Sequence, residues 1–185
     1  MGPWQNGSFP NLPKNQKAVY KIPRVTDFIS APTTKTYTGL GVIGYFVDGV
    51  GMFDSRDAFY WNGSADANGT GYWNRDAYYN EGATFDAAYA HQQNAGTYHY
   101  HADPIALRYL LADHVTYNAG AKTYAESTAA ITQHSPILGW AADGYPICGP
   151  YGYAKPKDAT SGLTRMRTGF TLSNGSNGTD NLGGG

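Results

Sequence analysis

Glycine and proline interrupt this chain throughout, and they limit the length of any regular element it can form. Glycine occurs 24 times and proline 10 times in 185 residues. Both residues favour turns and weaken helix interiors, so long helices are not expected. The apolar stretches between them are short and rich in β-branched and aromatic residues, as is typical of strands. We therefore predict a mainly β protein, a β-sandwich or partly closed barrel with one or two short helices and long Gly/Pro/Tyr-rich loops.

Local patterns place several of these elements. Residues 18–22 favour a short strand that ends at Pro23. Residues 42–47 and 50–53 are apolar and β-branched, and the Asp48-Gly49 pair between them predicts a hairpin turn. The pair Asp103-Pro104 predicts the start of a helix, with the aspartate as N-cap and the proline at the first helical position.

The chain is expected to form one domain with a tail. Residues 1–172 keep a mixed composition with enough apolar residues for a core. Residues 173–185 consist mainly of Gly, Asn and Ser, so we interpret them as a linker or a truncation point. A further chain segment beyond Gly185 would then complete the fold.

Two histidines stand one residue apart in the sequence Tyr98-His99-Tyr100-His101. Side chains alternate between the two faces of a strand, so a strand here would project both imidazoles to one face, roughly 7 Å apart along the chain. His91 lies eight residues before His99 and could supply a third imidazole from a nearby loop. Three imidazoles with an open coordination position suit catalytic zinc or copper. We therefore predict a metal site at His91, His99 and His101.

Other polar residues could support such a site. Asp86 and Asp103 are close enough in sequence to orient the imidazoles as hydrogen-bond acceptors. His134 is a candidate fourth ligand or general base, and Asp143 could orient a histidine or accept a proton. The alternative is that the histidines and tyrosines form a hydrogen-bonded network in a polar core, with His134 capping a turn.

Three further patterns carry weaker signals. Cys148 is the only cysteine, which excludes an internal disulfide, and its apolar neighbours favour a buried, inert thiol. Residues 66–69 resemble the start of a calcium loop but lack its later acidic ligand, so calcium is not expected. Five sequons are either glycosylation acceptors in a suitable host or good turn sequences: Asn6, Asn62, Asn68, Asn174 and Asn177.

Charge and hydropathy exclude some function classes. The charged fraction is 15%, the net charge is −1, and the basic residues are scattered. This distribution does not support binding to nucleic acid. No apolar run approaches the roughly 18 residues of a membrane-spanning helix. An abundance of Tyr, Thr, Asn and Gly with few Lys and Glu favours a secreted or cell-surface location.

The histidine motif and two later motifs together resemble the YHYH domain family. The resemblance covers roughly residues 42–153 and implies a protein that is mostly secreted or surface-associated, bacterial or marine, and without a settled activity. Cys148 stands where such proteins often carry Tyr, and members commonly continue beyond this length. The matching motifs are His91-x7-Tyr98-His99-Tyr100-His101-x2-Pro104, His134-Ser135-Pro136-Ile137-Leu138-Gly139 and Asp143-Gly144-Tyr145-Pro146-Ile147-x-Gly149-Pro150-Tyr151-Gly152.

These patterns lead to one main hypothesis and two alternatives. The main hypothesis is an extracellular domain with a copper or zinc site, either a metal-dependent oxidoreductase or a hydrolase, and the residues do not decide whether it is an enzyme. One alternative is a structural or adhesive subunit of an extracellular matrix or filament that associates with itself or with a polymer. The other is a carbohydrate-binding module that uses exposed aromatic rings. The rings in question are Trp61, Trp73, Tyr78, Tyr79 and Trp140.

Overall fold

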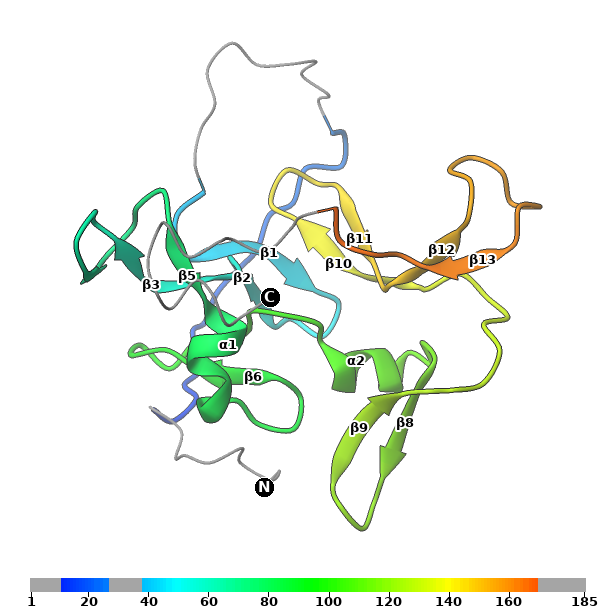
Figure 1. The fold of residues 1–185 in the computed structure, drawn as a ribbon, viewed down its shortest axis with the longest axis horizontal. Helices are drawn as coiled ribbons and strands as arrows, with labels where there is room; N and C mark the ends of the chain where they lie inside the picture. Colours follow the sequence, from blue (N-terminus) through cyan, green and yellow to red (C-terminus); the bar gives the residue numbers. More distant parts are fainter. Residues whose placement is uncertain (1–10, 27–37, 170–185) are drawn as a thin grey trace.

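The chain folds into short strands with two small α-helices, as the sequence predicts. The computed structural model describes residues 11–26 and 38–169 (Figure 1). The elements are β1 (Val42–Phe46), β2 (Gly51–Phe53), β3 (Arg56–Trp61), β4 (Asp66–Asn68), β5 (Asn74–Asp76), α1 (Ala77–Glu81), the 3-10 helix η1 (Gly82–Thr84), β6 (Ala90–Gln92), β7 (Tyr98–Tyr100), α2 (Ile105–Leu110), β8 (Val115–Asn118), β9 (Thr123–Glu126), β10 (Ile137–Ala141), β11 (Pro146–Cys148), β12 (Tyr151–Tyr153) and β13 (Leu163–Arg165).

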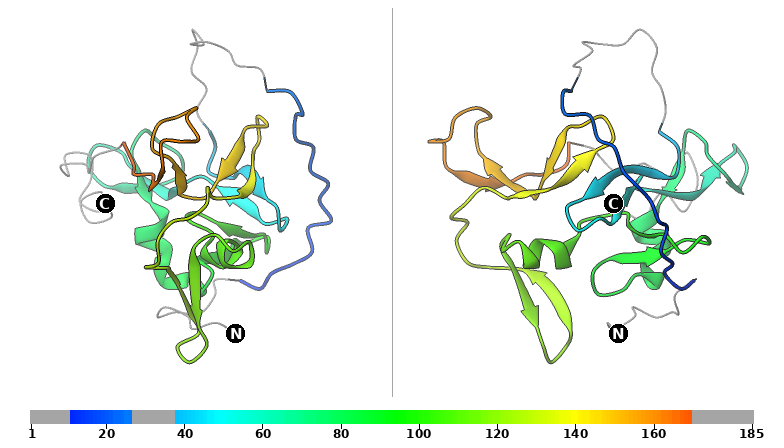
Figure 2. Two further views of the ribbon diagram at one scale, coloured as in Figure 1. Left: turned by 90° about the vertical axis from the view of Figure 1, so that its right-hand side faces the viewer. Right: turned by 180° about the vertical axis from the view of Figure 1, so that it is seen from behind.

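A six-stranded sheet forms the centre of the molecule, in the order β11-β10-β1-β2-β7-β6. Its neighbouring strands are antiparallel except for β2 and β7, which run parallel. The smaller sheet β4-β3-β5 extends from one side of the molecule, and the hairpins β8-β9 and β12-β13 extend from the other (Figures 1 and 2). Within the described ranges no sheet closes into a barrel, so the sandwich-like alternative fits better.

The hydrophobic core lies where the central sheet meets α2. Phe46 of β1 and Tyr100 of β7 meet edge to face, with ring centroids 5.2 Å apart. Leu107 of α2 and Leu138 of β10 complete this cluster, and both are almost fully buried. Each large apolar side chain buried here contributes on the order of 1.5–3 kcal/mol to folding. Because Tyr100 belongs to this core, packing fixes the position of β7, the strand that carries His99.

The predicted hairpin at Asp48-Gly49 is confirmed. Gly49 has a φ of +83°, which few other residues adopt at low cost. Asp48 supports the turn, because its Oδ1 accepts a hydrogen bond from the amide of Val50 at 3.0 Å. The turn brings β2 beside β1 and, on its other edge, beside β7.

Two local predictions are wrong. Residues 18–22 form no strand, and Val19 is 85% exposed, because residues 11–26 run as an extended segment across the surface (Figure 2). Asp103 does not cap α2, because Pro104 occupies the N-cap position without a side-chain bond and the Asp103 carboxylate pairs with Arg108 instead. Among the helices of residues 11–26 and 38–169, none combines the length and the hydropathy that a membrane span requires.

Candidate metal centre

A tight hairpin places His91 directly opposite His99. Strands β6 and β7 pair antiparallel, and His91 is the register partner of His99. The connecting turn is closed by a bond from the amide of Gly96 to the carbonyl of Gln93 at 2.7 Å, and Gly96 has a φ of +80°. The third histidine of the predicted site therefore comes from a strand, whereas the sequence suggested a loop.

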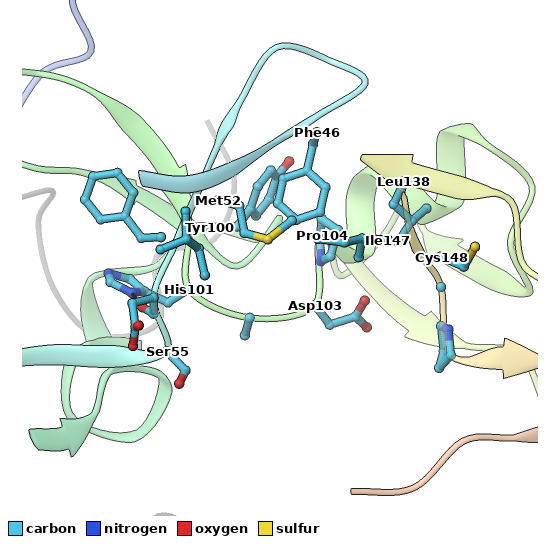
Figure 3. A pocket seen from close by; sticks show the side chains of 16 residues that line it. Phe46, Met52, Ser55, Tyr100, His101, Asp103, Pro104, Leu138, Ile147 and Cys148 are labelled. Carbon is cyan, nitrogen blue, oxygen red and sulfur yellow. Dashed lines mark hydrogen bonds between the residues drawn. The ribbon is translucent and has the colours of Figure 1, made fainter. Parts of the chain in front are cut away.

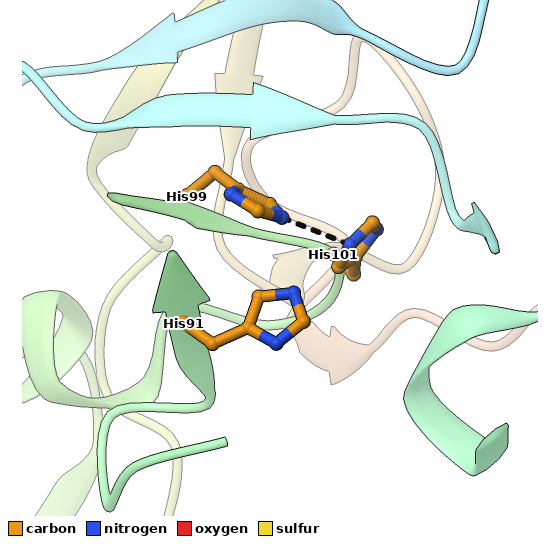
Figure 4. Close-up of side chains that lie close together, drawn as sticks. All are labelled: His91, His99 and His101. Carbon is orange, nitrogen blue, oxygen red and sulfur yellow. Dashed lines mark hydrogen bonds between the residues drawn. The ribbon is translucent and has the colours of Figure 1, made fainter. Parts of the chain in front are cut away.

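His101 is the residue directly after β7, and its ring points toward the rings of His91 and His99. The three imidazoles converge from the two neighbouring strands (Figure 4). One ring nitrogen from each lies within 4.8 Å of the other two. His91 and His99 are 5% and 1% exposed, so the rings meet beneath the surface. The structure thus brings together the three residues expected from the histidine spacing.

Hydrogen bonds to backbone carbonyls assign the tautomers of two of these rings. Nδ1 of His99 lies 3.0 Å from the carbonyl oxygen of Thr97, and Nδ1 of His101 lies 2.8 Å from that of Asp54. A carbonyl oxygen only accepts, so each Nδ1 must carry the proton and donate it. In the neutral ring the electron pair then belongs to Nε2. The Nε2 atoms of His99 and His101 face each other at 3.0 Å.

His91 reaches the same tautomer through a hydroxyl. Its Nδ1 lies 2.7 Å from Oγ1 of Thr84, and that hydroxyl donates to the carbonyl of Glu81 at 2.7 Å. Because the hydroxyl has one hydrogen and gives it to a carbonyl, it accepts the Nδ1 proton of His91. In its neutral form each of the three rings therefore directs the electron pair of Nε2 into the common space.

Glu81 completes the cluster, and the sequence reasoning missed it. Its Oε2 lies 3.2 Å from Nε2 of His91 and 3.6 Å from Nε2 of His101. It is the last residue of α1, whose N-cap Asp76 accepts a hydrogen bond from the amide of Tyr79 at 2.9 Å. Asp76 is a favourable N-cap residue and Gly82 follows six residues later, a pattern that indicates a short helix between them. That helix would have placed Glu81 at its C-terminal end.

Burial and neighbouring groups change the pKa values of the residues in this cluster. Burial lowers the pKa of His99 to about 3 and also lowers the pKa of His101, so both rings are neutral at pH 7. Burial opposes ionisation of Glu81, but the neighbouring histidines outweigh that effect and lower its pKa. Three imidazole nitrogens and one carboxylate converge. Their electron pairs and the negative charge of the carboxylate repel one another unless a proton or a cation lies between the groups.

Aromatic rings hold the imidazoles in place. Phe53 stacks on His99 with centroids 3.7 Å apart, and the fully buried Phe85 meets His91 edge-on at 4.9 Å. A cavity of about 270 Å³ opens beside the rings, and its lining includes Glu81 and all three histidines. The donors are thus accessible to a small molecule.

A second cavity, of about 390 Å³, lies on the far side of Phe53 and His101, which line both cavities. Its walls are mostly apolar, with Phe46, Tyr100 and Leu138 among them (Figure 3). Of the four converging donors only His101 lines this cavity.

Comparison with known proteins gives a single finding. A family model described as YHYH protein matches residues 19–184, nearly the whole chain. The chain belongs to the YHYH protein family. No curated protein and no solved structure matches it significantly. The family description names no reaction, so the activity of this YHYH protein must be argued from its geometry.

The two carboxylates expected to orient the histidines have other partners. Asp86 accepts the hydroxyl proton of Tyr98 at 2.5 Å and the amide protons of Ala88 and Ala90. Asp103 pairs with Arg108 at 2.6 Å. The Nδ1 atoms of the histidines are held by Thr84 and two carbonyls instead. Asp86 supports the site only indirectly, because it anchors the residue that precedes His99.

His134 and Asp143, the predicted catalytic pair, lie in other surroundings. His134 is exposed, packs against Tyr153 with ring centroids 5.2 Å apart, and faces the carbonyl of Ser135 through Nδ1 at 2.7 Å. Asp143 is exposed in the β10-β11 turn, where it accepts a hydrogen bond from the amide of Tyr145 at 3.3 Å. Neither belongs to the group of converging histidines.

The remaining predicted residues have mixed outcomes. The expectation of a buried thiol is wrong, because Cys148 is exposed on β11, where its side chain lines the second cavity. Asn62 closes a turn by accepting the amide protons of Ser64 and Ala65, and Asn68 is exposed on β4. The other three sequons lie outside the described residues: Asn6, Asn174 and Asn177.

Proposed function

We propose that this YHYH protein binds one transition-metal ion through Nε2 of His91, His99 and His101, with the Glu81 carboxylate as a fourth ligand. The observation that carries the proposal is the tautomer set: every Nδ1 is engaged, so every Nε2 offers its electron pair to the same space. Two nitrogens bound to one metal at about 2.0–2.1 Å lie about 3.3 Å apart in a tetrahedral site and about 2.9 Å apart at a right angle. The 3.0 Å between Nε2 of His99 and His101 fits that requirement.

Copper and zinc are the metals we propose. Imidazole suits both ions, and one carboxylate beside three imidazoles is compatible with either. Zinc that held a water molecule in a further coordination position would activate that water for hydrolysis, whereas copper would support redox chemistry. The metal therefore decides between the hydrolase and oxidoreductase alternatives.

Metal analysis tests the proposal directly. Protein purified without chelators, and protein reconstituted with Cu(II) or Zn(II), should contain close to one equivalent. Glu81→Gln and His101→Gln should weaken binding, while His134→Gln, which replaces an exposed imidazole elsewhere, should not. Cu(II)-loaded protein should show nitrogen hyperfine splitting from imidazole ligands in its electron paramagnetic resonance spectrum. Less than about a tenth of an equivalent of any metal, before and after reconstitution, would contradict the proposal.

A second candidate function, carbohydrate binding, is favoured by one observation. Trp73, Tyr78 and Tyr79 are 51%, 45% and 56% exposed, and Tyr78 and Tyr79 lie on α1 with Glu81. Exposed rings of this kind can stack on sugar rings. Titration with a glycan panel should then quench tryptophan fluorescence, and Trp73→Ala should abolish the response.

The structural or adhesive alternative stays a prediction that a concentration-dependent assembly assay would test.

We also propose a secreted or cell-surface location, on the basis of the low charge and the abundance of Tyr, Thr, Asn and Gly. Fractionation of the cells that make the protein would test this. Recovery in the cytoplasmic fraction alone would contradict it.

A further inference from the structure

The cavity beside the histidines is also lined by an arginine, Arg56. Arg56 and the four donors (Glu81, His91, His99 and His101) line the same space of about 270 Å³. Cavities of this size lie at the small end of ligand-binding sites, so they accept small molecules rather than polymers.

Arg56 is held in a fixed position by Asp54. Nε and Nη2 of Arg56 contact the two carboxylate oxygens of Asp54 at 2.7 and 3.0 Å, and Nη2 also donates to the carbonyl of Thr38 at 2.6 Å. Nη1 makes no hydrogen bond to any described residue. It is therefore the part of the guanidinium that remains available to a ligand.

The same aspartate connects Arg56 to the donor cluster. The backbone carbonyl of Asp54 accepts the Nδ1 proton of His101 at 2.8 Å, while its side chain holds Arg56. One residue in the β2-β3 turn thus fixes both a histidine of the cluster and the arginine. This arrangement keeps the guanidinium at a constant place relative to the donors.

The balance of charge indicates what the cavity would accept. A divalent ion held by three neutral imidazoles and one carboxylate keeps one positive charge, and the Arg56–Asp54 pair adds none. A monoanion would make the occupied site neutral, which is favoured where the surroundings are partly buried. Leu40, Phe53 and Ala58 also line the cavity and offer apolar contact to a hydrocarbon tail.

We propose that this cavity binds a small organic monocarboxylate, with one oxygen on the metal, the carboxylate held by Nη1 of Arg56, and the tail against Leu40 and Phe53. With Nε and Nη2 engaged, Nη1 would donate a single charge-assisted hydrogen bond to a carboxylate oxygen. The proposal rests on the metal centre proposed above and names the substrate class of that centre.

Titration of Co(II)-loaded protein with acetate, propionate and butyrate tests the proposal, with the cobalt visible spectrum as the readout. We expect saturable spectral changes and an affinity that rises by about two- to fourfold for each added methylene. Acetamide, which has the shape of acetate without its charge, should give no change. A response to acetamide equal to that of acetate, or an affinity that falls along the series, would overturn the proposal.

Variants separate the arginine from the metal. Arg56→Gln should weaken acetate binding by about 10- to 100-fold at unchanged cobalt stoichiometry, and Arg56→Lys should lie between it and the parent protein. The control Arg165→Gln removes an arginine of β13 that pairs with Glu126 of β9. Its acetate affinity should equal that of the parent protein. Equal acetate affinity in the Arg56→Gln and parent proteins would overturn the role of Arg56. Failure to bind cobalt, copper and zinc alike would overturn the metal centre itself, whereas bound cobalt without a response to acetate would overturn only this inference.

Discussion

At the scale of single residues, the site depends on the atoms that hold the outer nitrogen of each imidazole. Two of the three partners are backbone carbonyls, which no side-chain substitution removes, and the third is the hydroxyl of Thr84. The hydroxyl is itself oriented by the carbonyl of Glu81. The orientation of His91 is therefore the one that a single substitution can disturb without replacing a proposed ligand.

Thr84→Val should reduce metal affinity while the fold remains. The substitution keeps the shape of the side chain but removes the acceptor for the Nδ1 proton of His91. Loss of such an outer hydrogen bond typically costs 10- to 100-fold in metal affinity. Competition with a chromophoric chelator would measure the change. Thr116→Val, which removes an exposed hydroxyl on β8, is the matched control and should bind like the parent protein.

The metal-free protein should lose stability as the pH falls below about 6.5. The pKa of His99 is about 3 in the folded protein against an ordinary value of 6.5. Between these values the unfolded chain binds a proton that the folded protein does not, so the free energy of unfolding decreases with falling pH. The slope for one histidine approaches roughly 1.4 kcal/mol per pH unit, and the lowered pKa of His101 acts in the same direction.

Urea unfolding at several pH values between 7.5 and 4.5, in the presence of chelator, would measure this slope. The variant His99→Gln removes one of the two groups and should flatten the profile. A free energy of unfolding that stays constant between pH 7 and 5 would contradict the burial of neutral imidazoles.

At the scale of elements, the short helix α1 matters more than its five residues suggest. It ends at Glu81, and the 3-10 turn that follows it ends at Thr84, so two groups of the site depend on its position. A helix this short has little intrinsic stability. The cap at Asp76 and the fully buried Ala77 therefore fix its position.

Asp76→Ala should cost about 1 kcal/mol of folding free energy and also weaken metal binding. The cap is lost, so the end of α1 that carries Glu81 becomes less well placed. Chelator competition and urea unfolding on the same samples would show both effects. Asp158→Ala removes a comparable turn-capping aspartate on the exposed β12-β13 connection and should leave metal affinity unchanged. Equal effects of the two variants on metal affinity would contradict the role of α1.

At the scale of the whole molecule, a buried arginine joins elements that are distant in sequence. Arg108 of α2 is fully buried and contacts Asp113 at 2.8 Å, Asp103 at 2.6 Å and Glu126 of β9 at 3.0 Å. Glu126 in turn pairs with Arg165 of β13. The helix and both outer hairpins thus share one network of charges.

Arg108→Met should destabilise the protein by about 3–5 kcal/mol, because the buried carboxylate of Asp113 would lose its cationic partner. Urea unfolding would measure the loss. Arg165→Gln, which removes a half-exposed member of the same network, should cost less than about 1 kcal/mol. Similar losses in the two variants would contradict the assignment of Arg108 as the centre of the network.

The sequence by itself determined the class of the fold, the hairpin at Asp48-Gly49 and the three converging histidines, because each follows from local rules. Residues that alternate on a strand share a face, and a turn sequence brings its flanking strands together. Glu81, Arg56 and the tautomers were decided only by the tertiary structure. Their partners, such as the carbonyl of Asp54 beside His101, are far apart in the chain. Backbone oxygens carry no sequence signal, and a single carboxylate among many gains its role only through its neighbours in space.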